Sequence, residues 1–71
     1  MQVQTLVDIG ALVRGAREDA GLTQAELARR ARVSREWLVR FEAGRTNPQL
    51  PRILAVLAQL DLVLEVVKEE G

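Results

Sequence analysis

Apolar positions recur every three or four residues over most of this 71-residue chain, a spacing that predicts helices. The remaining positions are largely charged or small, so each stretch has one apolar and one polar face. Four stretches carry the pattern, and they span about residues 5–20, 24–31, 35–43 and 50–60. The pattern predicts a mainly α fold of four helices, forming a single domain over residues 1–71.

The two central helices carry the clearest start and stop signals. Thr23 precedes the first of them and Glu26 follows three residues later, which is the spacing of a capping box. Ser34 is an N-cap for the second, and Gly44 is placed to end that helix in a left-handed conformation. We therefore predict two short helices joined by a tight turn, a helix-turn-helix over residues 23–44.

One side of this helix pair is apolar and the other is charged. The inward positions are Leu27, Ala28, Ala31, Leu38 and Phe41, with Val33 in the turn. The outer face of the second helix carries Arg35, Glu36, Val39 and Arg40. Arginine pairs with guanine in the DNA major groove, a carboxylate accepts from cytosine N4, and an apolar side chain contacts the thymine methyl. These four residues are our candidate base readers, with an intrahelical Glu36–Arg40 pair as the alternative role for Glu36.

The first helix contains two glycines, and each weakens it by about 1 kcal/mol relative to alanine. Close packing against another helix is the expected reason for Gly10 and Gly15. The polar side of this helix, which holds Arg14, Arg17, Glu18 and Asp19, is predicted to be solvated. Glu42 adjoins the apolar face of its own helix, and we expect it to pair with an arginine of residues 24–31.

The segment 62–67 fits two patterns. As a helix it continues the apolar face of residues 50–60; as a strand it alternates between two faces, and its valines favour the strand. Backbone groups of a lone strand must pair outside their own chain. We therefore expect this strand to pair with the same strand of a second copy, giving a homodimer. The residues at that interface would be Leu62, Val63, Leu64, Val66 and Val67.

The amino-acid composition limits the functions that this chain can have. The net charge is zero, but residues 1–60 hold nine arginines against six acidic residues, and residues 61–71 hold one lysine against four. The basic part is thus the helical part, and arginine suits phosphate and guanine. The chain has no Cys or His and a single Ser, so we expect no enzyme activity, no metal site and no cofactor. Without a leader or a sufficiently apolar span, we expect a cytoplasmic protein that does not enter a membrane.

The central motif resembles the helix-turn-helix of the phage-repressor-like family, which includes Cro, repressor and XRE-type regulators. The matching residues are Thr23-Gln24, Leu27-Ala28, Val33-Ser34, Leu38, Phe41-Glu42 and Gly44-Arg45. This chain has Arg32 where the family usually has glycine, and a left-handed arginine costs on the order of 1 kcal/mol. The resemblance implies binding to double-stranded DNA, with Gln24 bonding a phosphate and Arg45 beside the DNA backbone.

Two residues of the motif have alternative roles. Ser34 is either a cap alone or a cap that also contacts a phosphate. Trp37 either packs into the core beside Leu38 or lies flat against the sugar-phosphate backbone.

Beyond the motif, Asn47-Pro48, the helix at 50–60 and the terminal LDLVLEVV run resemble the HipB-like antitoxin branch of the family. That branch implies a dimer held by an intermolecular β-ribbon. It further implies a repressor that autoregulates its operon and binds a HipA-like kinase toxin. The alternatives are an XRE-type regulator without a toxin, and a protein-interaction module that has lost DNA binding.

Overall fold

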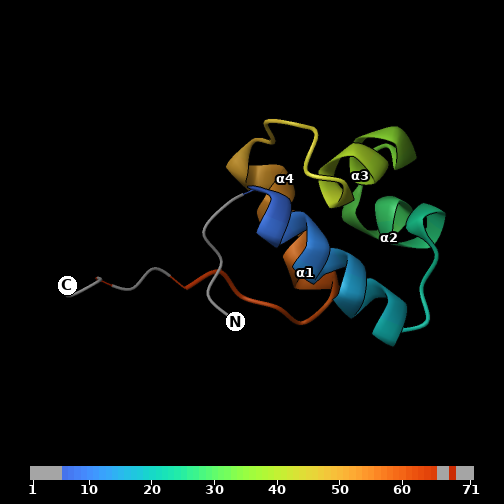
Figure 1. Ribbon diagram of the computed structural model, residues 1–71. Coiled ribbons are helices and arrows are strands. Elements are labelled where there is room, and N and C mark those ends of the chain that lie inside the picture. Colours follow the sequence, from blue (N-terminus) through green and yellow to red (C-terminus); the bar gives the residue numbers. More distant parts are fainter. Residues whose placement is uncertain (1–5, 66–67, 69–71) are drawn as a thin grey trace.

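A computed structural model of the chain describes residues 6–65 and residue 68, with the backbone alone described for residues 6–8. Four α-helices follow one another through this part of the chain (Figure 1). They are α1 (Leu6–Asp19), α2 (Gln24–Ala31), α3 (Arg35–Glu42) and α4 (Leu50–Gln59). The four predicted helices are confirmed, and every boundary lies within one residue of its expected position.

Side-chain caps start the two central helices. The Thr23 hydroxyl accepts from the Glu26 N–H at 3.1 Å, and the Thr23 N–H donates to the Glu26 carboxylate at 3.0 Å. This confirms the capping box, and the backbone hydrogen bond from Thr23 lowers the pKa of Glu26 below its ordinary value of 4.5. The Ser34 hydroxyl accepts from the Trp37 N–H at 3.0 Å. Only residues 32–34 separate the two helices, so these caps determine where the turn lies.

The same left-handed geometry ends each of the four described helices. A residue with positive φ follows each helix, and the next N–H bonds the carbonyl five residues earlier, as in a Schellman motif. The positive-φ residues are Gly21, Arg32, Gly44 and Asp61. Arg32 has φ 59° and ψ 42°, so the chain forms the expected turn despite lacking the family's glycine.

The core lies where α2 packs against α3 and α4 and where α1 packs against α3. Its buried apolar residues are Val13, Leu27, Ala28, Ala31, Leu38, Phe41, Ile53, Val56 and Leu57. Along α4, Leu54 is 44% exposed, whereas Val56 is fully buried. Leu50 and Leu54, one turn apart, therefore form an exposed apolar stripe on α4.

The two glycines of α1 have different environments. A Cβ placed on Gly10 would overlap the Phe41 carbonyl oxygen and lie 3.0 Å from the Glu42 carbonyl oxygen, so the backbones of α1 and α3 touch there. A Cβ on Gly15 would meet nothing within 4 Å. Close helix packing is confirmed for Gly10, whereas the same expectation for Gly15 is wrong.

The predicted strand over residues 62–67 is not formed by residues 62–65, and Val66 and Val67 lie outside the described residues. A strand needs a neighbour for its backbone, and the described part of this single chain offers none. The helical alternative is also wrong, because α4 ends at Gln59 and Asp61 is left-handed. Leu62 packs against the core, whereas Val63 and Leu64 are exposed.

The two glycines provide a matched pair of stability tests. We expect Gly15→Ala to stabilise the protein by about 0.5–1 kcal/mol, because alanine is the better helix former at an open position. Gly10→Ala should instead destabilise by about 1–3 kcal/mol, since a backbone carbonyl occupies the space of the new methyl group. Urea denaturation followed by circular dichroism measures both. Equal effects of the two substitutions would contradict the close approach of α1 and α3.

Candidate nucleic-acid interface

The candidate base readers lie on the outer face of α3. Arg35, Glu36, Val39 and Arg40 are all exposed, whereas Leu38, Phe41 and Glu42 of the same helix are buried. The division follows helical spacing, since Glu36 and Arg40 are one turn apart and point away from the core. The structure therefore gathers the four predicted side chains on one exposed surface.

Trp37 lies on the flank of α3 that faces α4. Its ring is stacked on Phe41 with centroids 5.0 Å apart, and the Arg52 guanidinium lies 6.0 Å from the Trp37 ring centroid. Trp37 is half-buried and packs against the core. The structure thus supports the packing role that the sequence left open, and the DNA contact by Trp37 stays a prediction.

A buried carboxylate connects α3 with α1 and α2. Glu42 accepts from Arg17 Nε at 2.7 Å and from a terminal nitrogen of Arg17 at 3.1 Å, and from the Gln24 amide at 3.2 Å. The Glu42 side chain is 3% exposed and that of Arg17 is 11% exposed. The remaining terminal nitrogen of Arg17 donates to the Leu22 carbonyl at 2.8 Å. Its hydrogen bonds to Glu42 raise the pKa of Arg17 above its ordinary value.

This network corrects two predictions. Arg17 is not on a solvated face, and the arginine that pairs with Glu42 belongs to α1 rather than to α2. One signal was present in the sequence: Glu42 lies four residues after the buried Leu38, so it shares the inward side of α3. A buried carboxylate requires a cation, but helical spacing does not say which arginine supplies it.

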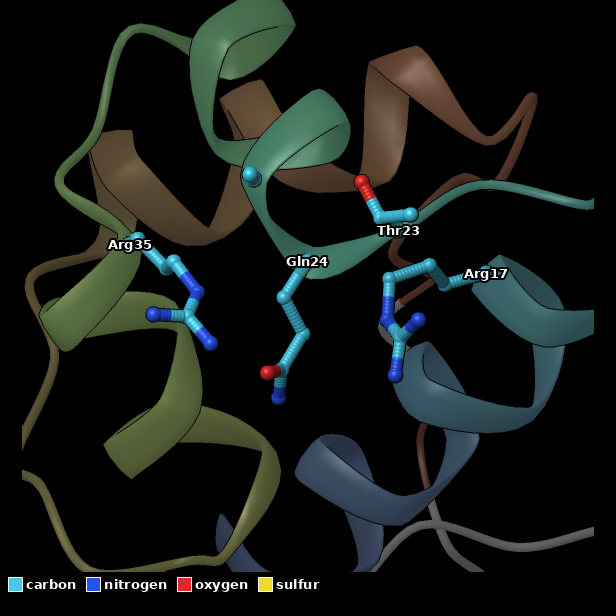
Figure 2. A pocket seen from close by; sticks show the side chains of 5 residues that line it. Arg17, Thr23, Gln24 and Arg35 are labelled. Atoms are coloured by element: carbon cyan, nitrogen blue, oxygen red, sulfur yellow. The ribbon is translucent and has the colours of Figure 1, made fainter.

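A groove of about 580 Å³ lies at the N-terminus of α2. Its lining residues are Arg17, Thr23, Gln24, Ala25 and Arg35. Figure 2 shows the Gln24 side chain lying between the guanidinium groups of Arg17 and Arg35. The N–H groups of the first helical residues have no intrahelical partner, and a helix N-terminus attracts anions. The groove therefore offers cationic and N–H donors to an anion.

A second groove, of about 310 Å³, adjoins the first. It is lined by Arg14, Arg17, Gln24, Val39, Glu42 and Ala43, so the two grooves share Arg17 and Gln24. Polar donors therefore run across three helices, from Arg35 on α3 through Gln24 on α2 to Arg17 and Arg14 on α1. The sequence pattern did not single out Arg14, because nothing local distinguishes it from other exposed arginines.

Ser34 and Arg45 lie outside both grooves. Ser34 is exposed and its cap on α3 is confirmed. Arg45 is exposed in the loop after α3, and its N–H bonds the Arg40 carbonyl at 2.9 Å. A phosphate contact by either residue stays a prediction. None of the helices within residues 6–59 is long and apolar enough to cross a membrane.

Comparison with known proteins agrees with this architecture. A family model described as a helix-turn-helix domain matches residues 8–69. An uncharacterized HTH-type transcriptional regulator, y4mF of Sinorhizobium fredii, is 38% identical over 66 residues, which cover 93% of this chain and 87% of that protein. The transcriptional regulator ClgR of Mycobacterium tuberculosis is 39% identical over 59 residues, covering 83% of this chain and 53% of ClgR. The chain thus spans about half the length of ClgR.

Solved structures show the same likeness. The clp gene regulator ClgR from C. glutamicum superposes with a TM-score of 0.78 at 31% identity, over 87% of this chain and 80% of that one. HipB, in a complex with an O2 20mer, superposes with a TM-score of 0.86 over 99% of this chain and 97% of that one. Identity to HipB is 21%, so this second likeness shows the fold alone.

The Arg17–Glu42 pair can be tested by a double-mutant cycle. Arg17→Met and Glu42→Leu should each destabilise by about 3–5 kcal/mol, because each leaves the other charge buried without its partner. The double variant should lose less stability than either single variant, since no unpaired charge remains. Urea denaturation followed by circular dichroism gives the change in the free energy of unfolding for each of the three variants. Additive losses would show that the two side chains do not depend on each other.

Proposed function

The chain belongs to the helix-turn-helix family of transcriptional regulators, and we propose that it is a sequence-specific repressor that binds a double-stranded DNA operator. One observation carries the proposal: the exposed face of α3 adjoins the grooves lined by Arg14, Arg17, Gln24 and Arg35. A recognition helix beside donors for phosphate is what reading a duplex requires, because phosphate contacts position the protein and base contacts specify the sequence.

In this proposal Gln24 makes the central contact to the DNA backbone. Its amide is held by the buried Glu42 carboxylate, so the side chain is oriented before DNA arrives. The N-terminus of α2 and the guanidinium of Arg35 flank the same groove and supply further donors for one phosphate. Ser34 precedes α3 and Arg45 follows it, and both would extend the phosphate contacts along the DNA strand.

Base reading falls to the outer face of α3. Arg40 and Glu36 lie one turn apart, and neither lines the grooves. Val39 is 40% exposed and borders the second groove, where a thymine methyl would meet it. Arg35, at the start of the helix, lies between the backbone contacts and these base readers.

We propose further that the repressor is a homodimer. Within the described residues the exposed large apolar side chains include Leu50 and Leu54 on α4, and Val63 and Leu64 after it. A second copy would cover them and would supply a strand partner for the segment 62–67, since residues 62–65 pair with no strand in the described part of their own chain. A twofold dimer presents two recognition helices, so we expect a near-palindromic operator with half-sites about one helical turn apart.

The more specific proposal is an antitoxin that binds a HipA-like kinase toxin and represses their shared operon. It is supported by the Asn47-Pro48 motif and the apolar tail, and by the fold shared with HipB, which has been solved with HipA, O2 and O3. The alternative is a regulator without a toxin, and the relatives named only as regulators favour it. Purifying the protein from its own host together with its bound partners distinguishes the antitoxin from the regulator without a toxin.

Base reading by Arg40 can be tested on two DNA duplexes. We expect Arg40→Ala to weaken binding to the DNA upstream of its own gene by roughly 1–3 kcal/mol, because a bidentate contact to guanine is lost. Binding to a scrambled duplex should change much less. Fluorescence anisotropy at fixed salt gives both affinities. If the unmutated protein binds the two duplexes equally well, it is not a sequence-specific repressor, and binding to neither favours the protein-interaction module.

The dimer can be tested by shortening the chain. A protein ending at Leu62 keeps the hydrogen bond from the Leu62 N–H to the Leu57 carbonyl that closes α4, at 2.9 Å. We expect it to be monomeric by light scattering and to bind the operator poorly, because two linked half-sites become one. A protein ending at Lys68 retains the whole segment 62–67 and should stay dimeric. If the shorter protein is also a dimer, the exposed stripe of Leu50 and Leu54 is the interface instead.

A further inference from the structure

The second groove extends the DNA-facing surface onto α1, where the family motif has no residues. Arg14 lies on α1 one turn before Arg17, and it lines this groove together with Val39 and Ala43 of α3. Its side chain is 65% exposed. A long, exposed guanidinium beside the recognition helix is thus positioned at the end of the surface that carries Gln24 and Arg35.

Arg14 is already engaged by a carboxylate of its own helix. Its Nε donates to Glu18 Oε1 at 3.0 Å, and the Glu18 side chain is 56% exposed. Among the described residues the two terminal nitrogens of Arg14 donate to no other group. Glu18 also lies close enough to Arg17 to act on its charge. One exposed carboxylate therefore stands beside both arginines of α1.

We propose that Arg14 is an additional contact to a DNA phosphate, and that Glu18 weakens DNA binding by competing with the phosphate for the Arg14 guanidinium. The proposal rests on the proposed function, since it assumes that the α3 face binds DNA. A solvent-exposed ion pair is weak, so a phosphate can displace the carboxylate. The bound guanidinium would turn its terminal nitrogens, which donate to no group among the described residues, toward the DNA strand.

The charges in the groove favour this assignment. Glu42 also lines it, but both of its oxygens accept hydrogen bonds from Arg17 and Gln24, so this carboxylate is neutralised. Arg14 is then the one lining cation whose charge is not matched by a buried partner. The opposing interpretation is that Arg14 and Glu18 form an ordinary (i, i+4) pair that stabilises α1 and touches no ligand.

The experiment measures salt-dependent DNA binding of five variants of the full chain. Arg14→Gln, Glu18→Gln and the double variant that combines them are the tests. Arg29→Gln and Asp19→Asn are matched controls, because each changes the charge by the same amount at an exposed position that lines neither groove. Circular dichroism first establishes that all five are folded at the assay temperature. The DNA is the duplex from upstream of the gene and a scrambled duplex of equal length.

We expect Arg14→Gln to weaken binding to both duplexes by the same factor and to make the slope of log K against log salt shallower by about 0.9. The ratio of the affinity of the unmutated protein to that of Arg14→Gln should then fall about 3.5-fold between 50 and 200 mM salt. Arg29→Gln should leave the slope unchanged. Glu18→Gln should strengthen binding to both duplexes more than Asp19→Asn does, and this gain should fall when Arg14→Gln is added.

Equal slopes for Arg14→Gln and Arg29→Gln would overturn the Arg14 contact, leaving the pair as a stabilising feature of α1. Equal affinities for Glu18→Gln and Asp19→Asn would overturn the role of Glu18. If the unmutated protein binds neither duplex, it is the proposed function that fails. That outcome is distinct, because the inference predicts differences among variants of a protein that binds.

Discussion

The arrangement of α1, α2 and α3 depends on one buried carboxylate. Burying the Glu42 charge is unfavourable unless cations and hydrogen-bond donors surround it. Arg17 supplies two donors from α1 and Gln24 supplies one from α2, and all three meet Glu42 only when the three helices are in their native positions. Burial of apolar side chains is non-directional, whereas these hydrogen bonds require particular distances and angles between the three side chains.

Close backbone contact makes the network possible. Gly10, Val13 and Arg17 lie on one face of α1, at spacings of three and four residues, and this face packs on α3. Because Gly10 has no Cβ, α1 approaches the carbonyls at the end of α3, and Arg17 then reaches Glu42. The side chains that satisfy the carboxylate also line both grooves. The donors proposed to contact phosphate are therefore oriented by the core, and less ordering is needed on binding.

α4 and the residues after it carry a second, apolar surface. α4 buries Ile53, Val56 and Leu57 but exposes Leu50 and Leu54, and the residues after it expose Val63 and Leu64. In Figure 1 the described part of the tail runs away from α2 and α3. The polar face of α3, which we propose binds DNA, is thus distinct from the exposed apolar residues, which we propose a second copy covers.

The sequence by itself determined the four helices and the ends of the two central ones, because caps, left-handed stops and the faces of a helix depend on residues only a few positions apart. Thr23 with Glu26, Ser34, Gly44 and the outer face of α3 could all be predicted for this reason. Only the tertiary structure decided which arginine pairs with Glu42, why Gly10 differs from Gly15, and which side of α4 is buried. These depend on contacts between helices, such as the pair 25 residues apart formed by Arg17 and Glu42. For residues 62–65 the sequence pattern alone was not sufficient, because the hydrogen-bond partners that would make them a strand are not within the described part of their own chain.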